Sequence, residues 1–511
     1  MLPARSLLAT TTLGFTLLAG TAMADLTASQ VWGDWRGYLE GLGYSVTADQ
    51  NTTDNTLFVR DITVQIDGDD DTETVSISVG DLQFLEQGDG SVGIMMPANM
   101  PIIVDITPDD GGKPAKIALD YTQTGHAMTV RGDADALSYD YTAVTFGLAL
   151  TSLVVDGAPV ESTDANFALK GDNVRSVTEV TAGDVRTYKQ NAEMGNIVYD
   201  IAFNDPESGE AMSLKSTVGR VVMSGTSSIP IEVLAQTDDL APLLGAGFSF
   251  DGTLDTTGTE NRIELTSIDG VSRIKTATQS ASLGLAVNPD GVKYDVAAEQ
   301  VQMGGQLAGV PFPLFLEMAK TGMELRAPLV QSDTPQDFSL GFNVTDFTMS
   351  DIIWALFDPE GQLPRDPATI ALDLSGVAKL LFDPFASDAA QELTNSEDAP
   401  AEINALRIER LVVDAIGAKI EAQGDLAFDN SDTTTLPGFP KPVGDIDINI
   451  AGANGLMDKL VAIGLLPADQ IIGARLMLGL FSVPGAEPDT LTSKIEFNDA
   501  GEIIANGQRI R

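Results

Sequence analysis

The sequence predicts a mainly β protein (α+β), with long antiparallel curled sheets, an N-terminal helix and a C-terminal helical hairpin. Apolar and polar residues alternate with period two through most of the chain, as in residues 446–450. Turn signals such as Asn288-Pro289-Asp290-Gly291 separate these segments at short intervals. Helical periodicity is concentrated near the start and in the last third. Antiparallel strands joined by short turns account for these observations.

The first 24 residues read as an export signal. Arg5 precedes an apolar stretch over residues 7–19, and Ala22-Met23-Ala24 supplies the small-x-small pattern that signal peptidase requires. We therefore expect a periplasmic protein cleaved after Ala24. The apolar stretch is too short to span a bilayer and no later stretch is long enough, so the mature chain is expected to have no transmembrane span.

A helix is predicted to open the mature chain. Thr27-Ala28-Ser29-Gln30 fits a capping box, in which side chains satisfy the first free N–H groups of a helix. Val31, Trp35 and Leu39 follow near helical spacing, and Gly43 is expected to end the helix.

Strands are predicted from there onward, with a hairpin connection at residues 67–72. The alternation is clearest in residues 62–66, 75–79, 117–121, 128–130, 148–154, 263–265, 283–287, 338–344, 372–374 and 446–450.

A soft domain boundary is expected near Ile229-Pro230. It would separate an N-terminal β domain with its leading helix (residues 25–229) from a C-terminal β domain (residues 230–511), although one continuous β unit is the alternative. Residues 386–401 read as an acidic surface loop or linker.

Helical patterns return late in the chain. Residues 350–357 and 376–382 predict short helices, and residues 455–481 predict a helical hairpin whose second helix begins near Pro467-Ala468-Asp469. That second helix is apolar nearly all round, which predicts burial on most sides or contact with an apolar partner. We therefore expect Leu476→Asp to destabilise the fold.

Composition excludes several function classes. The chain has 74 acidic and 29 basic residues and a formal charge of −45, which argues against nucleic acid or anionic lipid headgroups as partners. Solubility in a saline habitat and a surface for a cationic partner are the two explanations of this acidity. The absence of cysteine excludes disulfides and thiolate chemistry, and the single histidine, His126, excludes sites that need two.

An acidic segment is the one weak metal candidate. Asp67, Asp69 and Asp71 could offer oxygen ligands to Ca²⁺. An EF-hand loop starting at Asp67 would need glycine at Thr72 and glutamate at Ser78, and both requirements fail. A solvated turn is the favoured interpretation, so no metal site is predicted.

Catalytic motifs are incomplete. Ser272-Arg273-Ile274-Lys275 and Lys320-Thr321-Gly322 resemble two elements of penicillin-recognising serine enzymes, but the middle element and the helix carrying the first are missing. Gly245-Ala246-Gly247 lacks the third glycine of a dinucleotide fingerprint. His126 alone does not define a general base. We therefore expect no cofactor and no enzymatic activity.

Carboxylate pairs leave one catalytic class open, since glycoside hydrolysis needs two of them beside aromatic platforms. Such pairs are unavoidable among so many acids. Trp32, Trp35 and Trp354 offer a poor platform, so a glycan hydrolase is only the second alternative.

Several motifs lie in the last third of the chain and at its start. They are Phe357-Asp358-Pro359, Leu363-Pro364-Arg365-Asp366-Pro367-Ala368, Leu372-Asp373-Leu374-Ser375-Gly376, Gly464-Leu465-Leu466-Pro467, Asp489-Thr490-Leu491-Thr492 and Asn506-Gly507-Gln508, with the predicted helix from Trp32 to Gly43 and Tyr44 after it. Together they resemble an exported bacterial family known as domain of unknown function 2125, and the resemblance spans most of the mature chain. The resemblance transfers no catalytic residue, and the strand rhythm of the family is loosely similar to that of envelope proteins with long lipid grooves.

The expected function is a non-enzymatic periplasmic envelope protein that binds a lipid or other elongated apolar ligand in a β-groove. The first alternative is a packed β-sandwich that serves as an interaction or scaffold module for another envelope protein. Weak candidates for the apolar ligand site are Ile472, Leu476, Leu480 and Phe481.

Overall fold

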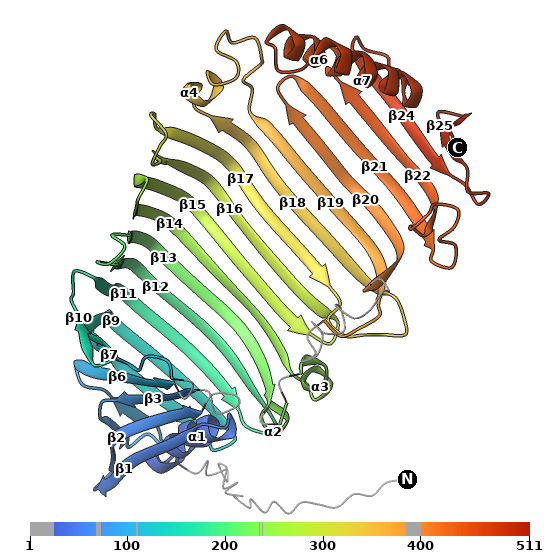
Figure 1. Cartoon of the computed structure of the whole chain (residues 1–511). Helices are drawn as coiled ribbons and strands as arrows, with labels where there is room; N and C mark the ends of the chain where they lie inside the picture. The colour runs from blue at the N-terminus through green and yellow to red at the C-terminus, as the bar shows by residue number, and fades with distance from the viewer. Residues whose placement is uncertain (1–24, 68–72, 109–110, 235, 238, 385–399) are drawn as a thin grey trace, which may run out of the picture.

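The computed structural model describes residues 25–67, 73–108, 111–234, 236–237, 239–384 and 400–511. In this part of the chain the strands form one antiparallel sheet, and helices lie at its two ends and along its rims (Figure 1). The predicted fold class is confirmed. The proposed signal segment, the 67–72 turn beyond Asp67 and most of the acidic linker lie outside the described residues.

The first strands are β1 (Ser45–Thr53), β2 (Thr56–Asp67), β3 (Glu73–Val79), β4 (Leu82–Glu86), β5 (Val92–Met95), β6 (Asn99–Pro108), β7 (Ala115–Thr124), β8 (Ala127–Gly132), β9 (Ala136–Val155) and β10 (Ala158–Val160). The central strands are β11 (Ala165–Thr181), β12 (Val185–Asn204), β13 (Ala211–Pro230), β14 (Ser249–Ser267), β15 (Gly270–Asn288), β16 (Gly291–Gln306), β17 (Leu314–Ala327) and β18 (Gln336–Met349).

The last strands are β19 (Ala368–Leu380), β20 (Ala401–Ala415), β21 (Ala418–Asp429), β22 (Lys441–Ala451), β23 (Val483–Pro484), β24 (Thr490–Phe497), β25 (Ile503–Ala505) and β26 (Gln508–Arg509). The helices are α1 (Ala28–Gly41), α2 (Ile231–Leu234), α3 (Leu240–Gly245), α4 (Asp351–Trp354), α6 (Ala453–Ala462) and α7 (Ala468–Phe481).

The sheet is a meander in which each long strand pairs with its neighbours in the sequence. From β11 to β22 every strand pairs with the next one. Near the N-terminus three long strands are interrupted, so that each consists of two shorter ones: β3 with β4, β5 with β6, and β7 with β8. The two parts of each interrupted strand pair with the same neighbour, which is either one strand or the two parts of another interrupted strand. The sheet also continues across Ile229-Pro230, since β13 pairs with β14 along almost its whole length.

A row of left-handed residues crosses the sheet near the middle of its strands, and we call it the kink row. Asn196 and Gly258 lie on either side of Gly219, whose ideal Cβ position would be 3.2 Å from the Thr257 carbonyl oxygen. A residue with positive φ kinks its strand and shifts the alternation of side chains by one position. The row consists of Asp61, Gly125, Asn173, Asn196, Gly258, Gln300 and Asp346, with φ between 46° and 63°.

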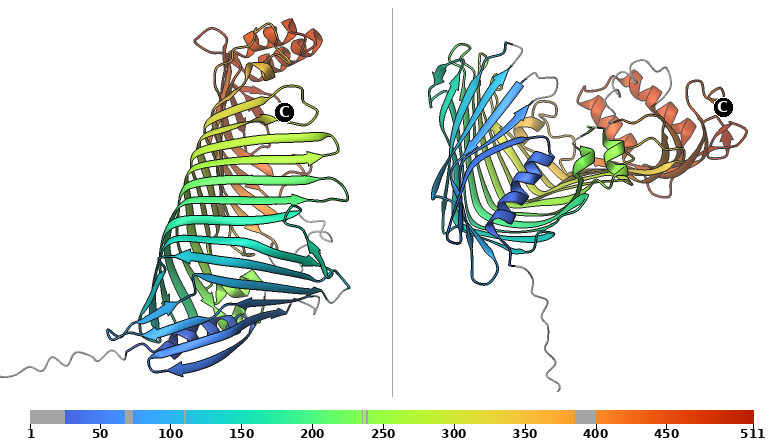
Figure 2. Two further views of the ribbon diagram at one scale, coloured as in Figure 1. Left: turned by 90° about the vertical axis from the view of Figure 1, so that its left-hand side faces the viewer. Right: turned by 90° about the horizontal axis from the view of Figure 1, so that it is seen from below.

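The kinked strands curl the sheet, and Figure 2 shows it curving around α1 at its N-terminal end. We call the face on which α1 and α7 pack the inner face, and the opposite one the outer face. Bulges at defined strand positions are how sheets acquire strong curvature. The kink row therefore explains how a meander of long strands becomes a curled sheet.

Helix α1 closes the N-terminal end of the inner face. Its capping box is confirmed, since the Thr27 hydroxyl oxygen accepts from the Gln30 N–H and the Gln30 side chain accepts from the Thr27 N–H. Val31 and Trp32 are buried against Phe84 of β4, with the Trp32 and Phe84 ring centroids 6.1 Å apart. This cluster is the largest buried core in the described chain.

Helices α6 and α7 lie between β22 and β24 in sequence and form the predicted hairpin at the other end of the sheet (Figure 1). Ile471 is 5% exposed, whereas Leu476 is 72% exposed. The expectation that Leu476 is buried is therefore wrong. The helix packs with one side only, and its apolar composition leaves an apolar surface open to solvent.

The predicted helix over residues 376–382 is also wrong. Residues of this segment belong to β19, where Gly376 pairs with Phe338 of β18 and with Leu406 of β20. A Cβ at Gly376 would lie 2.4 Å from the Ala405 carbonyl oxygen, so glycine permits a close approach of the strands here. Pairing on both edges outweighs the local helical pattern.

Candidate functional site

The inner face is apolar along almost the entire sheet. Residues that pair directly across strands share a face, so the pairings define rows of side chains that run across the sheet. One row crosses eleven consecutive strands, β12 to β22, and every member is apolar. It comprises Ala192, Met223, Leu254, Leu283, Val296, Met323, Phe342, Leu372, Leu411, Ala422 and Ile448.

Many of these side chains have no covering layer. Large apolar residues of the inner face are between 37% and 56% exposed, which is unusual for a contiguous surface. Extensive apolar surface of this kind marks a site for a ligand or partner. The exposed residues are Phe203, Met212, Met223, Phe250, Leu265, Leu283, Leu285, Met303, Met323, Phe342, Ile370 and Ile420.

The outer face carries the charge. Lys215 forms an ion pair with Asp200 at 3.1 Å, and Arg220 pairs with Glu193 at 2.7 Å. All four residues alternate with inner-face positions on β12 and β13. Charged and apolar side chains are therefore segregated to opposite faces of a single sheet.

On β14 and β16 small side chains stand beside the kink row. Thr256 and Thr259 of β14 stand on either side of Gly258, and Ala298 of β16 precedes Gln300. Larger residues such as Phe250 and Leu265 lie toward the strand ends. A concave surface with small residues at its bottom keeps room for a ligand between its walls.

The length of this surface exceeds that of one acyl chain. Ten interstrand steps of about 4.8 Å between β12 and β22 span about 48 Å. A hydrocarbon bilayer core about 30 Å thick allots about 15 Å to each leaflet. The inner face could therefore accept more than one acyl chain end to end.

A cavity of about 500 Å³ lies between α7 and the C-terminal strands. Met477 and Phe481 of α7 line it, together with Ile448 and Ile450 of β22. Of the four residues expected to bind an apolar ligand, Phe481 faces this cavity, whereas Ile472, Leu476 and Leu480 are exposed. The apolar surface thus continues from the sheet onto the helix.

A polar cluster lies under α1 at the opposite end. The Arg186 guanidinium donates from Nη2 to Asp34 Oδ2 at 2.7 Å and from Nε to the Tyr188 hydroxyl at 2.6 Å. The Tyr139 hydroxyl also donates to Asp34 Oδ2, at 3.2 Å, and accepts from Trp35 Nε1 at 3.1 Å. Burial raises the pKa of Tyr139 and of Tyr188, so both phenols stay protonated.

Arg186 is distinctive on the inner face. Among the described strand positions of β12 to β22, it is the one charged residue that the pairings place on that face. Its guanidinium carbon lies 5.5 Å from the centroid of the Tyr38 ring and 5.3 Å from that of Tyr188. A cavity of about 360 Å³ adjoins it, lined also by Asp34, Tyr38 and Tyr139.

The outer face has a hollow of about 530 Å³ whose arginines are paired with carboxylates. Arg262 and Arg273 line it, but Arg262 lies 3.7 Å from Glu260 and Arg273 lies 2.8 Å from Glu264. These exposed ion pairs are ordinary surface features.

The weak calcium candidate gains no support. Asp69 and Asp71 lie outside the described residues, and Asp67 ends β2. In the described chain no three His, Asp or Glu residues are grouped as a metal site would require.

The candidate catalytic residues are not brought together. Ser272 and Lys275 lie three residues apart on β15, where they occupy opposite faces. The Ser272 hydroxyl accepts from the Ala308 N–H at 2.9 Å. His126 Nε2 lies 2.9 Å from the Ile94 carbonyl oxygen, and its ring packs near Tyr141. Ser272 and His126 therefore each have a structural partner.

The tryptophans are packed rather than displayed. Trp32 and Trp354 are buried, and Trp35 packs edge-on against Phe84 with centroids 5.6 Å apart. Arg365 covers the Trp354 ring at 5.6 Å. They do not form an open platform for sugar rings.

Motif residues that carry the family resemblance hold loops in place. Buried Asp358 accepts from the N–H groups of Gln362 at 2.9 Å and Leu363 at 2.8 Å. These hydrogen bonds lower the pKa of Asp358 against the opposing effect of burial. Asp489 likewise accepts from the N–H of Gly455 at 2.9 Å, at the start of α6. Asp358 and Asp489 therefore have structural roles.

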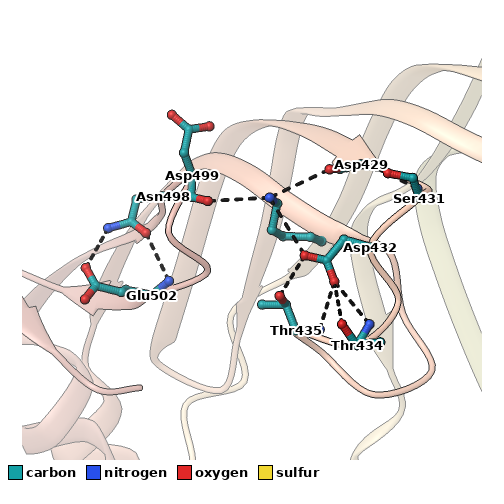
Figure 3. Close-up of polar contacts among 9 residues, drawn as sticks. Asp429, Ser431, Asp432, Thr434, Thr435, Asn498, Asp499 and Glu502 are labelled. Carbon is teal, nitrogen blue, oxygen red and sulfur yellow. Dashed lines mark hydrogen bonds and ion pairs between the residues drawn. The ribbon is translucent and has the colours of Figure 1, made fainter.

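A second structural cluster fixes the β21–β22 connection at the C-terminal end (Figure 3). The Asp432 carboxylate accepts from the Thr435 N–H at 3.0 Å and from the Thr435 hydroxyl at 2.7 Å. These hydrogen bonds lower the pKa of Asp432 to about 2. Lys441 Nζ lies 3.4 Å from the Asp499 carbonyl oxygen and 3.9 Å from Asp432 Oδ2. The cluster ties this turn to the C-terminal segment.

No protein-family model, curated protein or solved structure matches the chain. The described helices include none long and apolar enough to cross a bilayer.

Proposed function

We propose that the protein is a non-enzymatic envelope protein of the periplasm that binds acyl-chain lipids along the inner face of its curled sheet. The observation that carries this proposal is the row of apolar side chains over β12 to β22, together with the half-exposed residues beside it. Covering such residues with an acyl chain removes apolar surface from water, at about 25 cal/mol per Å².

The arrangement of charge supports the same ligand class. An acyl chain needs a long, uncharged surface and no particular hydrogen-bond partner. The inner face supplies that surface, whereas catalysis would require reactive groups in mutual contact. The export signal expected from the sequence would place the protein where acyl chains must cross water.

A scaffold role for a protein partner is the alternative occupant of the same face. The structure has one curled sheet in which α1 and the α6–α7 pair meet the inner face near its ends. A partner protein would therefore have to insert an elongated apolar segment. The test below distinguishes the two occupants.

The test compares charges placed on the two faces of neighbouring strands. Leu283→Glu with Met303→Glu adds two carboxylates to the inner face, at side chains that are 37% and 42% exposed. The control, Thr257→Glu with Gln302→Glu, adds the same charge at exposed outer-face positions of β14 and β16.

We expect saturable binding of a monoacylglycerol by the native protein, weakened at least about tenfold by the inner-face variant and unchanged in the control. Native mass spectrometry and displacement of an apolar dye measure it. If the native protein binds neither probe and instead purifies with one stoichiometric protein, the lipid proposal is wrong and the scaffold role stands.

A further inference from the structure

The cluster under α1 offers unused polar atoms next to a cavity. Arg186 uses Nε and Nη2, and Asp34 uses Oδ2, in the hydrogen bonds given above. Neither Arg186 Nη1 nor Asp34 Oδ1 has a hydrogen-bond partner among the described residues. A hydrogen-bond donor on the cationic guanidinium and a hydrogen-bond acceptor on the anionic carboxylate are therefore available at the same place.

The two side chains are shielded from water. Arg186 is 12% and Asp34 13% exposed, and aromatic rings surround them. At low exposure a charged group gains more from a further hydrogen bond than it would in bulk water. The adjoining cavity of about 360 Å³ has room for a polar group.

We propose that this cluster binds a zwitterionic phospholipid headgroup, with phosphate at Arg186 Nη1 and ammonium at Asp34 Oδ1. The inference rests on the proposed lipid binding and adds the class of headgroup. The Arg186–Asp34 pair has no net charge, so it matches a headgroup that also has none. Arginine suits phosphate because its guanidinium stays charged, so an N–H that it donates to a phosphate oxygen forms a charge-assisted hydrogen bond.

Aromatic rings favour the ammonium part of such a headgroup. Tyr38, Tyr139 and Trp35 line the same cavity as Asp34, and ring faces attract cations. An anionic lipid would gain the arginine contact but would meet the Asp34 carboxylate and the charge of −45 on the chain. The cluster therefore discriminates against headgroups with a net negative charge.

The Arg186–Asp34 cluster lies at one end of the uncharged inner face. Arg186 and Tyr188 lie at the start of β12, beside α1, and the uncharged inner face extends from them toward β22. A headgroup held there would leave its acyl chain to lie against residues such as Phe250, which is 38% exposed. The sheet thus has a polar end under α1 and an apolar end at α7.

The test compares three lipids with the same acyl chain: lysophosphatidylethanolamine, lysophosphatidic acid and monoacylglycerol. We expect the native protein to bind the zwitterionic lipid about tenfold more tightly than the other two, equivalent to about 1.4 kcal/mol. Arg186→Gln and Asp34→Asn should each remove this preference and leave the affinity for monoacylglycerol unchanged. Lys189→Gln, on the outer face of the same strand, should keep it.

The outcomes separate the two proposals. Equal binding of all three lipids by the native protein overturns the headgroup site and leaves the apolar surface intact. Binding of none of them overturns both proposals. Because the comparison among lipids uses the native chain, it decides the question even if the Arg186 variant fails to fold.

Discussion

Val218 and Val221 lie three residues apart on β13, yet both are buried in one cluster on the same face of the sheet. Regular strands place residues of odd separation on opposite faces. The kink row explains the exception, because the alternation shifts at Gly219 opposite Asn196. One apolar face is thereby preserved on both sides of the bend.

The left-handed residues of the kink row predict an unusual response to glycine. Gln300 has φ of 49°, where a non-glycine residue costs about 1 kcal/mol. Gln300→Gly should therefore leave the free energy of unfolding unchanged or raise it by up to about 1 kcal/mol. Gln302→Gly, two residues on in regular strand, should lower it by about 0.5–1 kcal/mol. Urea denaturation measures both, and a larger loss at residue 300 than at 302 would contradict the role of the kink.

The two faces of α7 predict opposite effects of the same substitution. Ile471→Asp places a carboxylate among buried atoms and should destabilise the protein by several kcal/mol. Leu476→Asp changes a side chain that is 72% exposed, so the melting temperature of this variant should match that of the native protein. Thermal unfolding followed by circular dichroism compares the two. Equal losses would show that both residues are buried in solution.

The capping box of α1 predicts a moderate loss. Thr27→Ala removes the hydroxyl that accepts from the Gln30 N–H and should cost about 1 kcal/mol of stability. Thr52→Ala on the exposed edge strand β1 serves as the control, with an expected change within about 0.5 kcal/mol. Amide exchange should also accelerate in α1 of the Thr27 variant. An undisturbed exchange rate there would rule out a capping contribution.

Asp432 predicts an acid-sensitive turn. Its pKa of about 2 in the folded protein lies below the ordinary aspartate value of 3.8, so its contribution to stability is full above pH 3.8 and is lost as the pH falls toward 2. Asp432→Asn should lower the melting temperature at pH 7, and the difference from the native protein should shrink between pH 4 and pH 2. A difference that is constant over this range would exclude the carboxylate as the cause.

The sequence predicts the features that depend on neighbouring residues. It does not predict which side chains of a long strand share a face. The α1 capping box needs only Thr27 and Gln30, and the period-two segments all lie in strands. The sequence predicts the long strands only as short pieces, because the kink row shifts the alternation within them. Nothing local marks Gln300 as left-handed, since only the pairing of its neighbours requires that conformation.

The sequence does not predict the candidate site either, because the shift of side-chain alternation at the kink row is not visible in it. Whether Arg186 lies on the inner or the outer face depends on the strand phase relative to Asn196, and its partners depend on the docking of α1. The apolar character of Ile472, Leu476, Leu480 and Phe481 is what makes them candidates for ligand binding on α7. Their surroundings depend on which side of the helix meets β22, and the nearly uniform composition of α7 does not specify that side.

The unbroken apolar row has a consequence for motion. In the proposed complex, an acyl chain displaced by one strand spacing leaves one set of apolar neighbours and gains another, from Leu254 onward to Leu411. Its energy therefore changes little with position, and sliding along the sheet would meet only low barriers. Contacts at the two ends of the sheet would then determine how long the ligand stays bound, and the inner face between them would allow it to diffuse from strand to strand.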